Sequence, residues 1–222
     1  DLLPTGITGV SIYNQRSGEF EFRQGPIISQ FVLADEVNRA TPKTQSAMLE
    51  AMEERQVTVE GVTHVVPRPF MVMATQNPVE YEGTFPLPEA QLDRFLLMIT
   101  LGYPTSDEEM LIIDDQRVSH PIDSLQPVAG GDEVTRLQET VRQVYVDDLI
   151  KQYVVALVGA THSHPDISLG SSPRGSLALF RGTQAIALLR DREFALPDDV
   201  KELVVPVLSH RIIVSAAARM RG

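Results

Sequence analysis

The segment "FVLADEVNRATPKTQSAMLEAMEERQ" (residues 31–56) joins a short apolar run to two adjacent acids and then to an amphipathic helix. The first four residues suit a strand that is buried on both faces of a parallel sheet. Thr41 can cap the following helix, and Pro42 fits its first position. Asp35 and Glu36 therefore lie where open α/β sheets bind ligands, just beyond the carboxyl end of a strand.

Strand and helix patterns alternate through the first hundred residues. Residues 9–24 predict a hairpin around a polar turn, and residues 56–66 predict a second hairpin. Apolar runs at residues 70–75 and 95–101 predict two more strands, with a short helix near residues 89–93 between them. This order of elements predicts an α/β sheet.

The chain changes character after Gly102, and we expect a second domain there. All later periodic segments predict helices, the clearest at residues 134–158 (interrupted near 146–148), 176–190 and 198–208. We place the boundary near residue 104. Residues 1–103 then form the α/β domain, and residues 104–222 form an all-helical domain.

The composition limits the possible classes of protein. The 222 residues are 43% hydrophobic, enough to bury a core, and the net charge of −11 works against nonspecific binding to nucleic acid. Cysteine is absent, which excludes disulfides and thiolate metal sites. The sequence has neither an apolar run long enough to span a membrane nor a secretory signal. We therefore expect a soluble, cytoplasmic protein without a nucleic-acid partner.

Five polar side chains are candidates for a site. Asp35 and Glu36 can divide the work of nucleotide hydrolysis, one reaching a magnesium ion and the other polarising an attacking water. Asn77 follows a second buried strand, where its amide can orient a water. Arg94 lies between a short helix and a strand, and Arg174 lies in the first turn of a helix, where a cation needs a nearby anion. Each also has a plain alternative as a turn, cap or surface residue.

Three stretches, taken in order, resemble the MoxR family of AAA+ ATPases between about Leu2 and His210. "LADEVNRATPKTQSAMLEAMEERQVT", "ATQNPVEYEGTFPLPEAQLDRF" and "SPRGSLAL" are similar to that family's Walker B, sensor 1, arginine-finger and sensor 2 regions. The resemblance implies a truncated AAA+ P-loop NTPase core, a parallel sheet with helices and β-hairpin inserts. An all-helical lid domain would follow it.

The resemblance also implies a role for each candidate. Asp35 would hold Mg²⁺, Glu36 would be the catalytic base that activates water, and Asn77 would be sensor 1. Arg174 would be sensor 2, contacting ATP from the lid, and Arg94 would be the finger that reaches a neighbouring subunit's nucleotide.

Further features of the family map onto other segments. Arg39 would support the subunit interface. Residues 9–24 are similar to the helix-2 insert and residues 56–66 to the hairpin before sensor 1, and both would face the pore of a ring or its partners.

The sequence departs from the family at the phosphate-binding loop. That loop requires G-x-x-x-x-G-K-[ST], and the printed sequence contains no Gly–Lys pair, because its lysines follow proline, isoleucine and valine (Lys43, Lys151 and Lys201). We therefore expect a partial protein without the Walker A segment, an incomplete catalytic unit that by itself hydrolyses little or no ATP.

The implied function is ATP hydrolysis in a hexameric ring of the chain with itself, coupled to chaperone-like remodelling or maturation of protein complexes. A protein client and a partner with a von Willebrand factor A domain are implied. A non-catalytic ring-forming or partner-binding adaptor is the main alternative. A metal-dependent hydrolase built on His162, His164 and Asp166, and a nucleic-acid motor, are two others.

Overall fold

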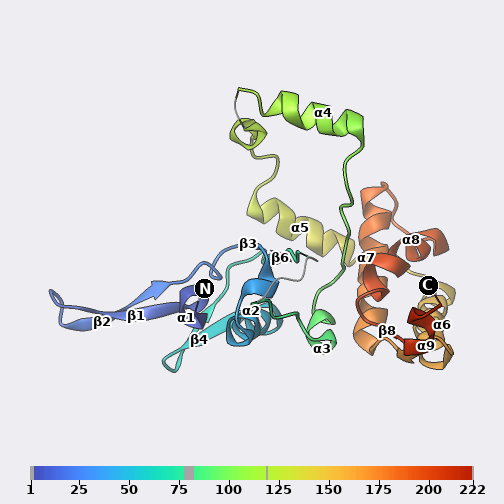
Figure 1. Cartoon of the computed structure of the whole chain (residues 1–222), viewed down its shortest axis with the longest axis horizontal. Coiled ribbons are helices and arrows are strands. Elements are labelled where there is room, and N and C mark those ends of the chain that lie inside the picture. Colours follow the sequence, from blue (N-terminus) through green and yellow to red (C-terminus); the bar gives the residue numbers. More distant parts are fainter. Residues whose placement is uncertain (1–2, 78–82, 119, 222) are drawn as a thin grey trace.

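A parallel pair of strands forms the centre of the N-terminal part of the chain (Figure 1). β3 (Phe31–Ala34) pairs in register with β6 (Met71–Ala74), so that Ala34 lies opposite Ala74. Because the strands are parallel, their carboxyl ends reach the same edge of the sheet. This pairing agrees with the predicted α/β class. The computed structural model describes three ranges of the chain: residues 3–77, 83–118 and 120–221.

Helix α2 (Pro42–Glu54) connects β3 to the next hairpin and covers the sheet with its apolar side. It begins as predicted, with a proline at its first position and Thr41 Oγ1 accepting a hydrogen bond from the Thr44 N–H at 3.4 Å. Met48 and Leu49 are 2% and 0% exposed, in a cluster that also receives side chains from β3 and β6. The shorter elements of this part are α1 (Pro4–Thr8), a 3₁₀ turn (Val37–Arg39) and α3 (Glu89–Leu92).

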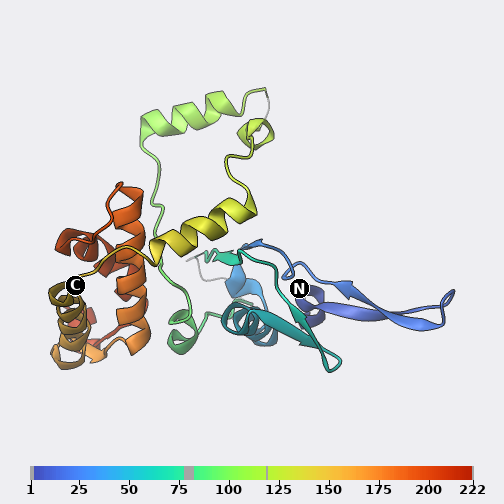
Figure 2. The same cartoon turned by 180° about the vertical axis from the view of Figure 1, so that it is seen from behind.

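Two antiparallel hairpins extend from the N-terminal part, as predicted. They are formed by β1 (Gly9–Asn14) with β2 (Glu19–Gln24), and by β4 (Gln56–Val59) with β5 (Val62–Val65). The rings of Phe22 and His64 stack with their centroids 3.8 Å apart, which joins the two hairpins. Both views show the β1–β2 hairpin projecting away from the helical part of the chain (Figures 1 and 2).

The C-terminal part is mainly helical. Its main helices are α5 (Gly131–Val141), α6 (Asp148–Ser163), α7 (Pro173–Leu189), α8 (Pro197–Leu208) and α9 (Ala216–Arg219). The predicted interruption near residues 146–148 falls between α5 and α6. One expectation is wrong, because a strand pair interrupts the helices: β7 (Ile167–Leu169) pairs antiparallel with β8 (Ile213–Val214). Strands of two or three residues are too short for a periodic pattern to reveal.

Each of the two parts of the chain has its own apolar core. The first belongs to the α/β part, and its buried members are Ile27, Val37, Met48, Leu49, Ala51, Val57, Val66, Phe70 and Leu87. The second belongs to the helical part, and its buried members are Val146, Ile150, Val154, Val158, Ala178, Leu179, Ala195, Val200, Leu203, Val207 and Leu208. Each cluster draws on one side of the expected boundary near residue 104. The ranges 1–103 and 104–222 stay a prediction.

The third strand expected at residues 95–101 is wrong. This segment is irregular, and no described strand lies beside it to receive its backbone hydrogen bonds. The Met98 N–H instead donates to the Pro206 carbonyl of α8 at 2.7 Å. An apolar run can therefore have the composition of a buried strand without having a partner strand.

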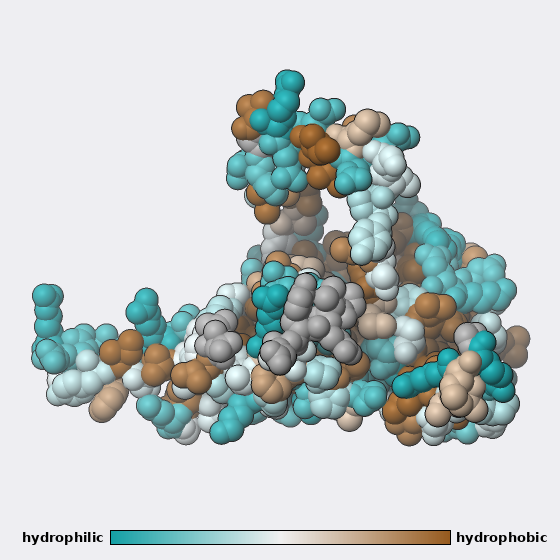
Figure 3. Space-filling view, viewed as in Figure 1, coloured by the Kyte–Doolittle hydropathy of each residue, from teal (hydrophilic) through white to brown (hydrophobic). Residues whose placement is uncertain are grey.

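An arm between the two parts stands away from both (Figures 1 and 3). It carries α4 (Ser106–Asp115), which starts with a capping box of Thr105 and Glu108, and a 3₁₀ turn (Pro121–Ser124). Every described residue from 100 to 130 is exposed. Among the described helices, none has the length and apolar character needed to cross a membrane.

A buried carboxylate stabilises the helical part. Asp199 is 1% exposed, and its Oδ1 atom lies 2.6 Å from Arg192 Nη2 and 3.1 Å from Arg190 Nη1. The Leu196 N–H donates to the other oxygen at 2.8 Å, which caps α8. Burial raises the pKa of the Asp199 carboxyl, but the hydrogen bonds from Arg192 and Leu196 and the arginine charges outweigh it. The net pKa lies below its usual value.

We expect Asp199→Asn to lower the free energy of unfolding by roughly 2 kcal/mol at pH 7, because charge-assisted hydrogen bonds are lost. Urea denaturation followed by helical circular dichroism measures this change. Since folding lowers the pKa of the carboxyl, its contribution is present above the unfolded value of about 3.9 and is lost as the pH falls through the folded value.

Asp198→Asn is the matched control. Asp198 is adjacent but exposed, and it pairs with the exposed Lys201, so its loss should change stability by less than about 0.5 kcal/mol. Equal losses in the two variants would contradict a structural role for the buried carboxylate.

Candidate functional site

Asp35 and Glu36 leave the sheet where β3 ends. Glu36 adopts a left-handed conformation with φ 47° and ψ 52°, which costs a non-glycine residue about 1 kcal/mol. A strained backbone conformation of this kind persists only where neighbouring groups hold the residue in place. Here the Glu36 N–H donates to Thr75 Oγ1 at 2.8 Å, and the Val37 N–H donates to the Thr75 carbonyl at 2.9 Å. The end of β6 thus holds the turn that carries both acids.

Thr75 positions both acids at once. Its hydroxyl accepts from the Glu36 backbone and donates to Asp35 Oδ1 at 2.6 Å. Its own N–H donates to the Ala34 carbonyl at 3.0 Å, which extends the contact between β3 and β6 by one residue. The geometry of the acids therefore depends on the register of the two strands.

The Glu36 carboxylate contacts the side-chain amide of Asn77 and the guanidinium group of Arg39. Asn77 Nδ2 donates to one oxygen at 3.4 Å, and Arg39 Nε lies 3.1 Å from the other. Asn38 Nδ2 donates to the Asn77 carbonyl at 3.1 Å and so orders the segment that follows β6. The structure thus brings Glu36 and Asn77 together, as the sequence predicts. We call Asp35, Glu36, Thr75 and Asn77 the acid–amide cluster.

Asp35 fits a role as a magnesium ligand. Its carboxylate is exposed beyond the sheet edge, with the Thr75 hydroxyl beside it. Mg²⁺ prefers such hard oxygen ligands, keeps several waters, and is usually held by one or two carboxylates together with the phosphates of a substrate. One carboxylate at this edge is therefore a suitable protein contribution to a magnesium–nucleotide complex.

Arg94 and Arg174 come from distant parts of the chain and meet on one carboxylate. Arg94 Nε lies 3.1 Å from Glu53 Oε2, and Arg174 Nη2 pairs with Glu53 Oε1. The two arginine side chains are 32% and 48% exposed, so both remain accessible to a further anion. The dipole of α7 disfavours a cation such as Arg174 in its first turn, and the negative charge of Glu53 compensates for this effect.

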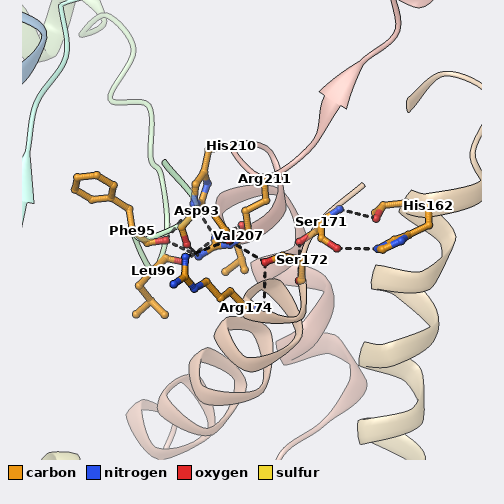
Figure 4. A network of polar contacts seen from close by, with 11 residues as sticks. Asp93, Phe95, Leu96, His162, Ser171, Ser172, Arg174, Val207, His210 and Arg211 are labelled. Carbon is orange, nitrogen blue, oxygen red and sulfur yellow. Dashed lines mark hydrogen bonds and ion pairs between the residues drawn. The ribbon is translucent and has the colours of Figure 1, made fainter. Parts of the chain in front are cut away.

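Asp93, next to Arg94, is the centre of a polar network between the two parts of the chain (Figure 4). Asp93 Oδ2 accepts a hydrogen bond from Ser172 Oγ at 2.8 Å and lies 3.7 Å from Arg174 Nη1. Asp93 Oδ1 lies 3.0 Å from Arg211 Nε. We call Glu53, Asp93, Arg94, Arg174 and Arg211 the arginine cluster.

A buried histidine borders this network. His210 and Arg211 are 6% and 7% exposed, and His210 Nε2 lies 2.7 Å from Arg211 Nη1 and 3.2 Å from the Phe95 carbonyl. Burial and then the charge of Arg211 lower the pKa of His210, against smaller opposing effects of Phe95 and Asp93. The imidazole is therefore neutral at neutral pH.

The five predicted residues fall into two groups. Asp35, Glu36 and Asn77 belong to the acid–amide cluster, whereas Arg94 and Arg174 belong to the arginine cluster. Of the hydrogen bonds and ion pairs between described residues, none joins the two clusters. Within one chain, the arginines therefore do not contact the acids.

The metal-hydrolase alternative lacks a ligand set in the ranges that the structure describes. His162 Nε2 lies 2.7 Å from the Ser171 carbonyl, and His164 Nδ1 accepts a hydrogen bond from the Asp166 N–H at 3.2 Å. The Asp166 carboxylate pairs with Arg221. These ranges contain no group of three or more acidic or histidine side chains that could hold a metal ion.

Sequence reasoning did not single out Thr75, Glu53, Asp93 or Arg211. Thr75 ends the run "FMVMAT", where a hydroxyl directly after a buried strand is a signal that could have been used. Asp93 directly precedes Arg94, but its partner Arg211 lies 118 positions away. No local pattern reveals a pairing over that distance.

Comparisons with known proteins match both parts of the chain. Residues 1–97 match the family described as "ATPase family associated with various cellular activities (AAA)", and residues 159–222 match the AAA lid domain. The uncharacterized protein YeaC of Bacillus subtilis is 54% identical over 222 residues, covering 100% of this chain and 69% of YeaC. Chaperone MoxR1 of Mycobacterium tuberculosis is 44% identical, covering 97% of this chain and 59% of MoxR1.

Two further comparisons agree. Protein MoxR of Paracoccus denitrificans is 30% identical, covering 100% of this chain and 72% of that protein. The crystal structure of a candidate ATPase from Cytophaga hutchinsonii aligns with a TM-score of 0.92 at 39% identity, covering 100% of this chain and 70% of that one. The fold of an α/β core followed by a helical lid is thereby confirmed.

We expect the free energy of unfolding to fall as the pH drops below about 6.5, the ordinary pKa of histidine. Folding lowers the pKa of His210, so the unfolded chain binds the proton more readily and acid favours unfolding. Urea denaturation at pH 5, 6 and 7 measures the slope. His210→Gln should reduce it, because the buried imidazole is then gone. An unchanged slope in His210→Gln would contradict the expectation.

Proposed function

This chain belongs to the MoxR family of AAA+ ATPases, and on that premise we propose that it hydrolyses ATP between neighbouring copies of a hexameric ring. The observation that carries the proposal is the separation of the two clusters. Acids and an amide suited to activating water gather at the sheet edge, and two arginines gather beside the lid. A nucleotide bound at the acids of one copy can meet Arg94 of the next copy only when the copies assemble.

The proposed site uses the two acids differently. Asp35 would hold Mg²⁺, which when bound would neutralise charge on the phosphates of ATP. Glu36 would accept a proton from the attacking water, and its left-handed backbone and Thr75 contact support a fixed position for this carboxylate. Asn77 contacts Glu36 and would orient the same water against the terminal phosphate.

The two arginines would act on the phosphates of ATP in different ways. Arg94 is the proposed finger for the nucleotide of the neighbouring copy, and Arg174 is the proposed sensor 2, which would contact ATP from the lid; both pair with Glu53. An anionic phosphate would replace this carboxylate and offer acceptor oxygens to both guanidinium groups. Such a finger contributes about a thousandfold or more to the rate of phosphoryl transfer.

The proposed biological role is chaperone-like remodelling or maturation of protein complexes in the cytoplasm. The relative named chaperone MoxR1 supports it. The two hairpins are the proposed contacts with a protein client or a partner carrying a von Willebrand factor A domain, and Arg39 is the proposed support of the interface between copies. Because the chain spans 59 to 72% of these curated relatives, the tests below use the protein expressed from its entire coding sequence.

We expect Glu36→Gln to keep ATP binding and to lower turnover by about a hundredfold or more, because the general base is lost while the shape of the side chain is kept. Fluorescent-nucleotide binding and phosphate release measure the two properties. Glu139→Gln, an exposed substitution on α5, is the control and should keep both. If wild-type protein binds ATP without hydrolysing it, the adaptor alternative is correct.

We expect Arg94→Ala to lower turnover about a thousandfold while leaving nucleotide binding in the same copy intact, because the finger serves the adjacent site. Mixing Arg94→Ala with Glu36→Gln should restore part of the activity, since some sites then combine an intact base with an intact finger. Arg181→Ala, at an exposed arginine of α7, is the matched control and should keep full activity. Absence of recovery on mixing would show that Arg94 does not act across an interface.

A further inference from the structure

We propose that Arg211 of the lid is a positioning residue that holds the Arg94 turn in place through Asp93. The inference rests on the proposed role of Arg94 as a finger for the neighbouring copy. It goes further, because it assigns to the lid the polar contacts that position the finger, in addition to the apolar packing of the turn on the α/β part.

The Arg94 turn packs on the α/β part through Leu92 and Phe95, but it lies in a segment with little regular structure. It follows α3, a helix of only four residues, and isolated helices of that length are unstable. The segment after it, residues 95–101, forms no strand with the described sheet. Side-chain packing alone leaves the backbone carbonyls of this turn without strand partners, so their polar contacts must come from another part of the chain.

Arg211 supplies those contacts. Its side chain is 2% exposed, and its Nε atom lies 3.0 Å from Asp93 Oδ1. One terminal nitrogen donates to the Asp93 carbonyl at 3.2 Å, the other donates to the Leu96 carbonyl at 3.2 Å, and Phe95 also offers its carbonyl. The guanidinium group thus binds the backbone on both sides of Arg94, as Figure 4 shows for its labelled partners.

Asp93 connects this turn to the second arginine. The carboxylate oxygen that does not face Arg211 accepts the Ser172 hydroxyl at 2.8 Å and lies 3.7 Å from Arg174 Nη1. Ser172 caps α7, because its Oγ accepts a hydrogen bond from the Arg174 N–H at 3.2 Å. A single carboxylate therefore fixes Arg94 and Arg174 relative to each other and to the lid.

The chemistry of the contact requires arginine. Its planar fork presents five donors in a fixed geometry, whereas lysine has one compact ammonium group. Arg211→Lys keeps the charge and part of the buried stem but cannot bind Asp93 and three carbonyls together. A displacement of about 1 Å at a catalytic group can cost on the order of a hundredfold in rate.

The test uses Arg211→Lys in the protein expressed from its entire coding sequence. We expect kcat to fall about a hundredfold with a much smaller change in the KM for ATP, because the acid–amide cluster is untouched and Ser172 still caps the helix that carries Arg174. Mixed with Glu36→Gln, the variant should recover activity, since Glu36→Gln copies provide intact fingers. Mixed with Arg94→Ala, it should recover none, because both copies then lack a working finger. Asp93→Asn should show the same pattern if Arg211→Lys folds poorly.

Arg192→Lys is the matched control, because Arg192 also binds a buried carboxylate in the lid but lies in a different network. It should lower Tm while keeping kcat. If Arg94→Ala recovers with Glu36→Gln but Arg211→Lys and Asp93→Asn do not, the positioning role is wrong and the finger role stands. If Arg94→Ala does not recover either, the proposed function itself fails.

Discussion

The ion pair between Asp93 and Arg211 joins the α/β core to the lid. Both side chains are largely removed from water, at 16% and 2% exposure, so each charge depends on the other for the loss of its solvation. Arg211 has further acceptors in the backbone carbonyls around Arg94, and Asp93 has a further donor in Ser172. Both side chains therefore have several hydrogen-bond partners. Removing either side chain would leave the other with fewer partners and little water around it. The two parts of the chain are thus held in one relative position.

A second constraint acts at the opposite end of the core, where the register of β3 and β6 sets the acids. The in-register pairing places Thr75 one residue beyond the strand end, beside Asp35 and Glu36. A slip of one residue would turn the Thr75 side chain to the other face of the sheet. The left-handed backbone at Glu36 would then lose the hydrogen bond that supports it. The conformation of Glu36 thus depends on the packing of the core, because Met48 and Leu49 of α2 pack in the same apolar cluster as side chains of β3 and β6.

The sequence predicted the elements whose signals are local. Alternation located both hairpins, the proline and threonine at the start of α2 located its cap, and the short apolar runs located β3 and β6. The prediction of a strand at residues 95–101 is wrong, because this apolar segment has no described strand beside it. The strands β7 and β8 were also missed, because they are too short to show a period. The convergence of Asp35, Glu36 and Asn77 followed from parallel strands, whereas the pairing of Asp93 with Arg211 depends on how two domains pack and has no local signal.

The charges of the two clusters explain why neither completes a site alone. In the arginine cluster, Arg94 and Arg174 share the single carboxylate of Glu53, while Asp93 is shared with the buried Arg211. Two guanidinium groups therefore share one carboxylate, while Glu50 and Glu54 line the same pocket as Arg94 and Glu53. At the sheet edge, two acids face one arginine, Arg39, so that edge has an excess of negative charge. A magnesium–triphosphate complex has a cationic centre that suits the acids and an anionic terminal phosphate that suits the arginines. Such a ligand can bridge the two kinds of surface only if they face each other, and in the proposed ring this would happen between neighbouring copies without any change in the fold of either.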